Sequence, residues 1–297
     1  MKKKSPKVSI IMNCYNGDKF LFEAIKSVIN QTYENWELIF FDNKSNDESK
    51  KIFFSFKDRR LKYFYGKKHT SLYQARNAAI KKASGSYIAF IDTDDLWVNK
   101  KIELQINLLK DPEVGLVYSN FYLLKNNTGQ IKKFSRYFLP SGYIFEKITQ
   151  NYNIGVVTTV IKKKFFYKLK KKFNNKYNHV GDMDLFIRLS KICKFCALQE
   201  PLAYVRLHGS NLSSLKKTDE IEELKHWKNN NRKFLSKKSL DFFNKRILNI
   251  DFINSKLEKK FLRSLKLILF SNPNIINLRN IVILVTPNFI LKKVMWF

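Results

Sequence analysis

Apolar and polar positions alternate with two different periods over the first 120 residues. Short apolar, β-rich runs predict strands at residues 7–13, 35–42, 62–65, 87–92 and 114–119. Between them, apolar residues recur at helical spacing and predict helices at residues 20–30, 71–83 and 99–110. Strands and helices that alternate in this way favour a parallel α/β sheet, whose ligands bind outside the carboxyl ends of the strands.

Polar side chains gather where these predicted strands end. The stretch "SYIAFIDTDDLWV" carries three carboxylates directly after a buried apolar run. Three acids so close together repel one another unless a positive charge lies between them, and a divalent metal would supply it. The simpler alternative is that these acids only cap the following helix. The full set of strand-end residues is Asn13, Tyr15, Asn16, Asp42, Asn43, Asp92, Asp94 and Asp95.

The pattern loosens after about residue 120. The run "GVVTTVIKK" at 155–163 predicts a strand, and "GDMDLFIRLSKIC" at 181–193 predicts a helix with acids in its first turn. Beyond about residue 215 the predicted strands stop and basic amphipathic helix follows. We therefore expect two domains, a catalytic one at 1–214 and a helical extension at 215–297.

Composition and charge narrow the classes of function. Of the 297 residues 44% are hydrophobic, which is typical of a globular chain, and the formal net charge is +31. That charge indicates a nucleic acid or an anionic membrane as partner, or else a genome-wide bias toward lysine. Three cysteines do not predict a disulfide framework, and no run is long enough to span a bilayer. With no signal peptide in the pattern, we expect a cytoplasmic protein.

Four ordered segments resemble the motifs of the family 2 glycosyltransferases, which are inverting enzymes of the GT-A fold. They are "VSIIMNCYNGDKFLFEAIKSVINQTYENWELIFFDNKSNDES", "ARNAAIKKASGSYIAFIDTDDLW", "GDMDLFIRLS" and "YVRLHGSNLS". The resemblance covers roughly residues 6–214. It implies a Rossmann-like α/β fold with a mixed, mainly parallel sheet flanked by helices, followed here by a basic helical appendage.

The resemblance assigns roles to the acids after the fourth strand. Asp94 matches the metal ligand, and its hard oxygens suit Mn²⁺ or Mg²⁺. Asp92 matches a residue that serves the ribose or the metal's waters, and Asp95 supports the turn. His208 matches a histidine near the metal or the diphosphate, with a surface loop histidine as the alternative.

The resemblance also assigns a nucleotide site. The base would be held by Asn13, Cys14, Tyr15, Asp42 and Asn43. The family usually has two adjacent acids at the last two positions, and this chain has "DN". An aspartate or an asparagine carbonyl can accept the N3 proton of uracil or thymine, so we expect a UDP- or dTDP-sugar. For Asn43, the alternative is a plain turn residue.

Two further residues would carry the transfer itself. Arg76 matches an arginine that faces the diphosphate, and the alternative is a surface arginine. Asp182 matches the catalytic base, which takes the proton of the acceptor hydroxyl as that hydroxyl attacks the anomeric carbon. Asp184 is the competing candidate, because the family often has two adjacent acids and Met183 separates them here.

The resulting hypothesis is a metal-dependent transferase that builds a cell-surface glycan from a nucleotide-sugar donor and a glycan or lipid-linked acceptor. One alternative is a basic nucleic-acid-binding protein, although no nucleic-acid-binding signature occurs and we expect no such partner. Another is a sugar nucleotidyltransferase, whose glycine-rich phosphate loop is missing here. The segments "KLEKKFLRSLKLILF" and "NIVILVTPNFILKKVMWF" predict an anchor on an anionic membrane at the inner face of the plasma membrane. Packing on the catalytic domain, or on a second subunit in a homo-oligomer, is the alternative.

Overall fold

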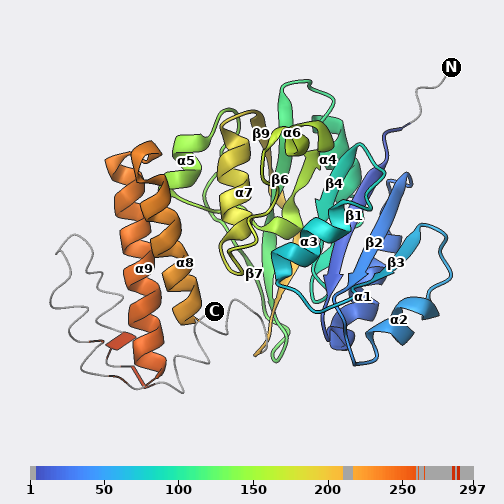
Figure 1. The fold of residues 1–297 in the computed structure, drawn as a ribbon, viewed down its shortest axis with the longest axis horizontal. Coiled ribbons are helices and arrows are strands. Elements are labelled where there is room, and N and C mark those ends of the chain that lie inside the picture. Colours follow the sequence, from blue (N-terminus) through green and yellow to red (C-terminus); the bar gives the residue numbers. More distant parts are fainter. Residues whose placement is uncertain are drawn as a thin grey trace. The chain divides into compact units, whose positions relative to one another are not determined.

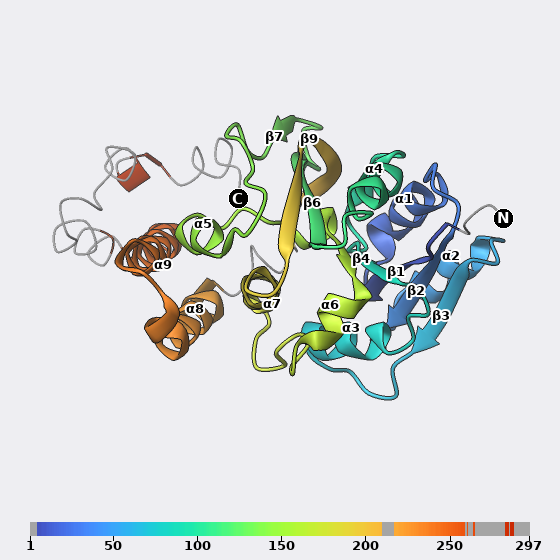
Figure 2. The same cartoon turned by 90° about the horizontal axis from the view of Figure 1, so that it is seen from above.

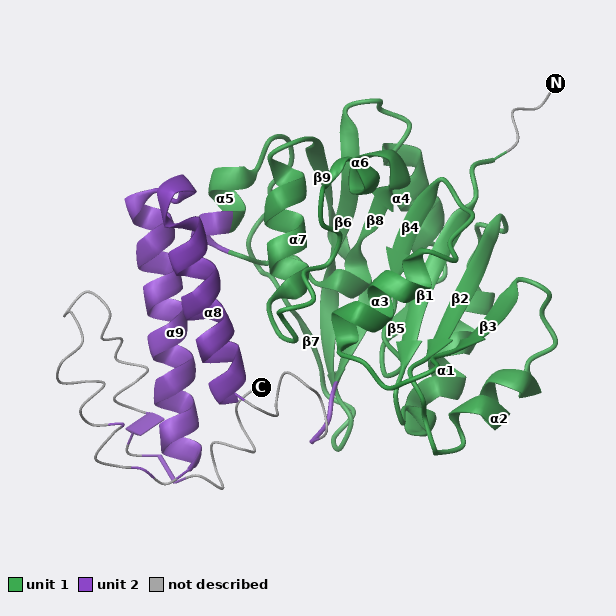
Figure 3. Cartoon of the chain, viewed as in Figure 1, with its two compact units in different colours: residues 1–148, 152–206 green, residues 149–151, 207–297 purple. Residues whose placement is uncertain are grey.

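The computed structural model describes residues 5–209 and 217–258, together with 260, 264, 283–284 and 286–287. The chain divides into two compact units, which Figure 3 colours separately. The first contains residues 1–148 and 152–206, and the second contains residues 149–151 and 207–297. The domain boundary at 214 stays a prediction, because residues 210–216 lie outside the described part of the chain.

The first half of unit 1 alternates strand and helix (Figure 1), as the sequence predicts except for a short helix at Ser49–Ser55 that was not predicted. Its elements are β1 (Val8–Cys14), α1 (Asp18–Ile29), β2 (Trp36–Asp42), α2 (Ser49–Ser55), β3 (Leu61–Tyr65), α3 (Leu72–Ile80) and β4 (Tyr87–Phe90). The β1, β2 and β4 strands are almost completely buried, which explains their continuous apolar runs. Helices α1 and α4 cover one face of this sheet, and α3 and α6 cover the other (Figure 2).

The second half of unit 1 combines two long strands with short strands and helices. These are β5 (Leu96–Trp97), α4 (Lys101–Leu108), β6 (Val114–Lys125), β7 (Ile131–Lys133), α5 (Phe145–Gln150), η1 (Val156–Thr158), β8 (Val160–Lys162), α6 (Lys163–Lys168), α7 (Gly181–Ser190) and β9 (Lys194–Leu207). The last residues of α5 and of β9 belong to unit 2.

One sheet joins these strands in the order β3-β2-β1-β4-β8-β6-β9-β5, with β7 paired to β6. Strands β1 to β4 pair in parallel, whereas β8 pairs antiparallel with both β4 and β6. The expected mixed α/β sheet is confirmed, and the parallel pairs β1–β2, β1–β4 and β2–β3 lie in the N-terminal half, where helical crossovers connect the strands.

The strand predicted at residues 155–163 is only partly correct. Strand β8 begins at Val160, because η1 occupies the preceding residues. The Thr158 hydroxyl donates to the Gly155 carbonyl, and the Thr159 hydroxyl donates to the Val156 carbonyl. These local hydrogen bonds stabilise a turn in place of strand pairing.

Unit 2 contains α8 (Lys217–Asn231), η2 (Arg232–Phe234) and α9 (Lys237–Leu257). The buried side chains of Ile221, Leu224 and Trp227 in α8 and Phe243 in α9 supply its apolar contacts, with the Trp227 and Phe243 rings 4.9 Å apart. Most residues of the two predicted membrane-binding segments lie outside the described part of the chain. Within the described part, no helix has the length and apolar character needed to cross a bilayer.

Candidate active site

Strand β4 delivers the three acids to the carboxyl end of the sheet. Its chain stays beside β1 as far as Ile91, whose N–H donates to the Ile11 carbonyl at 3.1 Å. Residues 92–95 then form a turn, which we call the acid turn, with a hydrogen bond from the Asp95 N–H to the Asp92 carbonyl. Asp92 and Asp94 are half-buried, and Asp95 is buried.

The acid turn concentrates negative charge. The pKa of Asp95 is raised well above its ordinary value, first by burial and then by the nearby carboxylates of Asp94 and Asp92. A hydrogen bond from the Arg206 N–H to Asp95 Oδ1, 3.1 Å long, acts in the opposite direction. Clustered carboxylates of this kind favour a bound cation.

Arg206 supports the acid turn from β9. Its buried guanidinium donates from Nε to the Asp94 carbonyl at 3.1 Å and from Nη1 to Asn126 Oδ1 at 3.3 Å. Nη2 forms an ion pair with Glu23 of α1 at 2.5 Å. Arg206 therefore joins three segments at the acid turn. Sequence reasoning missed this residue, although it lies within the quoted segment "YVRLHGSNLS".

A second buried arginine, Arg76 of α3, also contacts the acid turn. It is 3% exposed and forms an ion pair with Asp92 Oδ1 at 2.5 Å. Burial alone would lower the pKa of Arg76, but the charge of Asp92 raises it above its ordinary value. The alternative of a surface arginine is wrong, and a permanent cation is buried beside the three acids.

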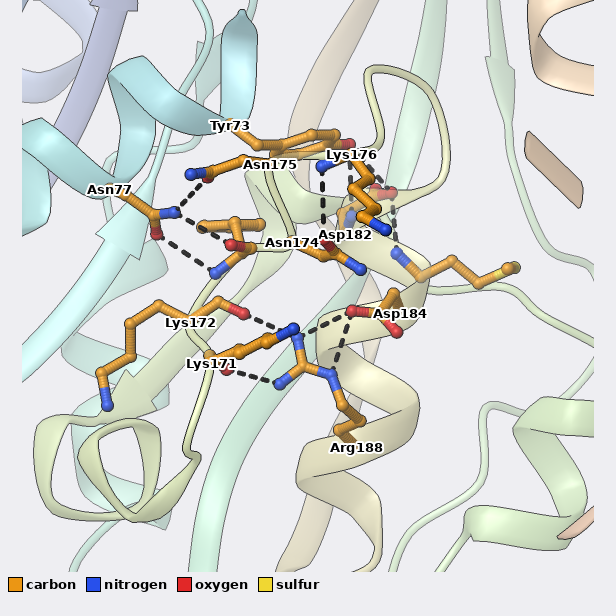
Figure 4. A network of polar contacts seen from close by, with 12 residues as sticks. Tyr73, Asn77, Lys171, Lys172, Asn174, Asn175, Lys176, Asp182, Asp184 and Arg188 are labelled. Carbon is orange, nitrogen blue, oxygen red and sulfur yellow. Dashed lines mark hydrogen bonds and ion pairs between the residues drawn. The ribbon is translucent and has the colours of Figure 1, made fainter. Parts of the chain in front are cut away.

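Helix α3 also contacts the candidate base (Figure 4). The Tyr73 hydroxyl lies 3.4 Å from Asp182 Oδ1 and accepts a hydrogen bond from the Asp182 N–H at 3.2 Å. Gly181 permits this approach, because a Cβ atom there would lie 2.4 Å from the Tyr73 ring. Since Tyr73 and Arg76 are three positions apart, they lie on one face of α3. One helix thus contacts both the acid turn and Asp182.

The two acids of α7 have different surroundings. Asp184 is buried and accepts hydrogen bonds from Arg188 Nε at 3.0 Å and from Nη2 at 2.8 Å. The guanidinium also donates to the carbonyls of Lys171 and Lys172 (Figure 4). Asp182 is only half-buried. These contacts give Asp184 a structural role and leave Asp182 the better candidate for a base.

Strand β1 ends in residues suited to a ligand. Both side-chain amide atoms of Asn13 are buried, and they have no hydrogen-bond partner among the described residues. Unsatisfied buried amides are rare, and a bound ligand is one way to satisfy them. Next to it, burial raises the pKa of Cys14, whose thiol lies 3.2 Å from Ser49 Oγ. The centre of the exposed Tyr15 ring lies 4.0 Å from the centre of the His69 ring. The sequence analysis assigned no role to His69.

Asp42 and Asn43 hold neighbouring loops. Asp42 accepts hydrogen bonds from the Tyr63 hydroxyl at 2.6 Å and from the Ser45 N–H at 2.7 Å. The Asn43 amide donates to the Thr70 carbonyl at 2.7 Å and accepts from the Thr70 N–H at 3.1 Å. An aspartate could not make the donated bond. The "DN" pair therefore has a structural reason, and Asn43 is more than a plain turn residue.

The acid turn fits a cation that a substrate helps to bind. Among the described residues, no group of three or more His, Cys, Asp or Glu side chains is arranged to hold a metal ion. Mg²⁺-type sites that are completed by substrate phosphates need only one or two carboxylates. The half-buried Asp94 and Asp92 meet that requirement. His208 belongs to unit 2, and its role as a ligand stays a prediction.

Comparisons with known proteins agree with this architecture. The model of the family described as glycosyl transferase family 2 matches residues 9–189. Escherichia coli WfgD, a UDP-Glc:alpha-D-GlcNAc-diphosphoundecaprenol beta-1,3-glucosyltransferase, is 32% identical over 220 residues, which are 73% of this chain and 82% of WfgD.

Two solved structures share the fold at low sequence identity. S. aureus TarS 1–349 in complex with UDP-GlcNAc has a TM-score of 0.65 at 16% identity, over 88% of this chain and 79% of that one. The mannosyltransferase PcManGT of Pyrobaculum calidifontis, in complex with GDP-Man and Mn²⁺, has a TM-score of 0.61 at 15% identity, over 98% and 81%. These likenesses confirm the expected GT-A fold, and the chain belongs to glycosyl transferase family 2.

Proposed function

We propose that this chain transfers a sugar, with inversion at the anomeric carbon, from a UDP- or dTDP-sugar to a glycan or lipid-linked acceptor in cell-surface polysaccharide synthesis. The observation that carries the proposal is the acid turn, where Asp92 pairs with the buried Arg76 and the buried Arg206 donates to the Asp94 carbonyl and to Asp95. A site of this charge pattern suits a diphosphate bound together with a cation.

Each residue near the acid turn would contribute a separate task. Asp94, with Asp92 beside it, would hold Mn²⁺ or Mg²⁺, whose chemistry is to neutralise charge on the leaving diphosphate. Arg76 would orient the phosphates through its planar guanidinium. Asp182 would accept the proton of the attacking hydroxyl, while the Tyr73 hydroxyl fixes the orientation of that carboxylate.

The nucleotide would lie at the ends of β1 and β2. The unsatisfied Asn13 amide would bond to it, and the exposed Tyr15 ring, backed by His69, would stack on the base. Cys14, Asp42 and Asn43 are buried, so they would shape the pocket from behind.

The names of the relatives support the donor and acceptor classes. WfgD is named for a UDP-glucose donor and a diphosphoundecaprenol-linked acceptor. The complexes of TarS and PcManGT contain UDP-GlcNAc and GDP-Man, so the fold serves more than one base. A lipid-linked acceptor agrees with a cytoplasmic enzyme at the inner face of the plasma membrane. The C-terminal segment would contact that membrane. The alternative is that this segment packs on a second subunit in a homo-oligomer.

A screen of nucleotide sugars tests the proposal. Thermal stabilisation in Mn²⁺ by UDP- or dTDP-sugars, followed by a product whose anomeric configuration is inverted, is the expected outcome. If none of the nucleotide sugars stabilises the protein in the presence of the cation, the proposal is wrong. A product with retained configuration would contradict a single displacement by the acceptor hydroxyl with Asp182 as its base.

A further inference from the structure

The segment between β7 and α5 exposes an unusual group of aromatic side chains. Tyr137 is 83% exposed and Phe138 is 82% exposed, and Phe134 and Tyr143 are also exposed. Single exposed apolar residues are common on protein surfaces, but adjacent aromatic residues displayed in this way indicate an interaction site. We call residues 134–143 the aromatic loop.

The aromatic loop is anchored on both sides of the exposed pair. The Asn120 amide exchanges two hydrogen bonds with the Ser135 backbone, at 2.7 and 3.1 Å. The Gln199 amide exchanges two more with the Leu139 backbone, at 2.8 and 3.0 Å.

Leu139 itself is completely buried. Ordering a loop costs conformational entropy, and here that ordering fixes Tyr137 and Phe138 in solvent, without burying them. The fold therefore presents these two rings outward.

The charge along the loop's own stretch of sequence indicates its partner. Between Val114 and Phe145 the sequence contains no Asp or Glu, and its charged residues are Lys125, Lys132, Lys133 and Arg136. The last three of these are exposed. Aromatic rings favour the headgroup region of a bilayer, and lysine and arginine bind to anionic lipid surfaces. This combination fits an anionic lipid surface.

The aromatic loop is connected to the active site within unit 1. It follows the β6–β7 hairpin, in which Asn126 accepts a hydrogen bond from Arg206, and Arg206 in turn donates to the Asp94 carbonyl. Binding of the loop to a bilayer would therefore fix the position of the acid turn relative to the lipid headgroups.

We propose that the aromatic loop is a membrane-docking surface of the catalytic unit, which inserts Tyr137 and Phe138 among anionic headgroups and so brings the site to a lipid-linked acceptor. That docking brings the site to a lipid-linked acceptor rests on the proposed function, whereas the docking itself does not. The aromatic loop belongs to unit 1, whereas the C-terminal segments belong to unit 2.

Flotation of the full chain with vesicles tests the docking without any substrate. We expect binding to phosphatidylcholine vesicles only when they contain phosphatidylglycerol, and we expect salt to weaken it. The double variant Tyr137→Ser/Phe138→Ser should lower the partition coefficient at least about tenfold. Lys132→Ser/Lys133→Ser should lower the partition coefficient on vesicles that contain phosphatidylglycerol and weaken its dependence on that lipid.

A matched control is available on α2. Phe54 is 51% exposed and has Lys50 and Lys51 as neighbours, so Phe54→Ser and Lys50→Ser/Lys51→Ser remove the same chemistry from another surface. These variants should float like the wild type. The proposal is overturned if the loop variants also float like the wild type, or if light scattering shows that they abolish a dimer and leave flotation unchanged.

Transfer assays separate this inference from the proposed function. The loop variants should keep wild-type rates on a water-soluble acceptor and lose rate on the same acceptor displayed in vesicles. Equal losses on both acceptors would contradict docking. Absence of transfer by the wild-type protein, with flotation intact, would contradict the proposed function and leave the docking surface standing.

Discussion

The two acids at the start of α7 should separate catalysis from stability. Asp182→Asn keeps an oxygen that can accept the hydrogen bond from the Met183 N–H, which is 2.8 Å long. We therefore expect its free energy of unfolding to stay within about 0.5 kcal/mol of the wild type. Because an amide cannot take a proton from the acceptor, the transfer rate should fall at least about a hundredfold.

Asp184→Asn should have the opposite effect. Loss of one partner from a buried ion pair costs about 3–5 kcal/mol. The Arg188 side chain is 27% exposed and keeps two carbonyl partners, so we expect a smaller loss of about 2 kcal/mol. For a chain of this size that corresponds to a melting temperature lower by roughly 4–8 °C. Its turnover at a temperature where it is folded should stay within about threefold of the wild type.

The assay for both variants is thermal unfolding combined with initial rates at saturating donor. The reasoning is refuted if Asp184→Asn loses more turnover than Asp182→Asn while its melting temperature is unchanged. That result would place the base two positions further along α7 and would make the Arg188 pair part of the catalytic apparatus.

Three further changes test the surroundings of the site. Arg76→Lys replaces the planar guanidinium, so the donor should bind about tenfold more weakly by calorimetry, and an unchanged affinity would exclude a phosphate contact. Gly17→Ala places a Cβ atom 2.6 Å from Thr93 Oγ1, beside the acid turn, and should cost about 1–3 kcal/mol of stability; a wild-type melting temperature would contradict this contact. In Glu37, burial raises the pKa, but hydrogen bonds from lysine and serine neighbours outweigh it and lower the pKa below the ordinary 4.5. Its ionised form therefore stabilises the fold above about pH 4.5, and this contribution disappears as the pH falls below that value. Glu37→Gln should cost about 2 kcal/mol at neutral pH and less below pH 4, and a constant difference would refute the assignment.

The sequence predicts the parallel half of the fold well because hydrophobic periodicity there is local. The predicted apolar runs and amphipathic helices of this half all appear as elements of the structure, and the seven-residue helix α2 was not predicted. The antiparallel half could not be derived in the same way. Strand β8 pairs with β4, so that Ala89 lies opposite Val160. Hydrophobic periodicity is a local property of the sequence and cannot predict a pairing between residues so far apart in the chain.

The candidate site shows the same division. The residues at strand ends were predictable, because parallel strands bring their carboxyl ends to one edge of the sheet. How their hydrogen bonds are satisfied was not predictable. Asn43 binds Thr70 and Asn13 has no partner among the described residues, yet both are asparagines at the carboxyl end of a strand. Arg206 was missed because it is remote in sequence from the acid turn that it supports.

The most direct test of the site is calorimetric binding of UDP to the wild type and to Asp94→Asn, each with and without Mn²⁺. The account predicts that Mn²⁺ strengthens UDP binding to the wild type at least about tenfold. It also predicts that Asp94→Asn loses this gain while its melting temperature stays at the wild-type value, since Asp94 is half-buried and its carbonyl contact to Arg206 is retained. An equal gain from Mn²⁺ in both proteins, or none in the wild type, would contradict a nucleotide–cation site at the acid turn.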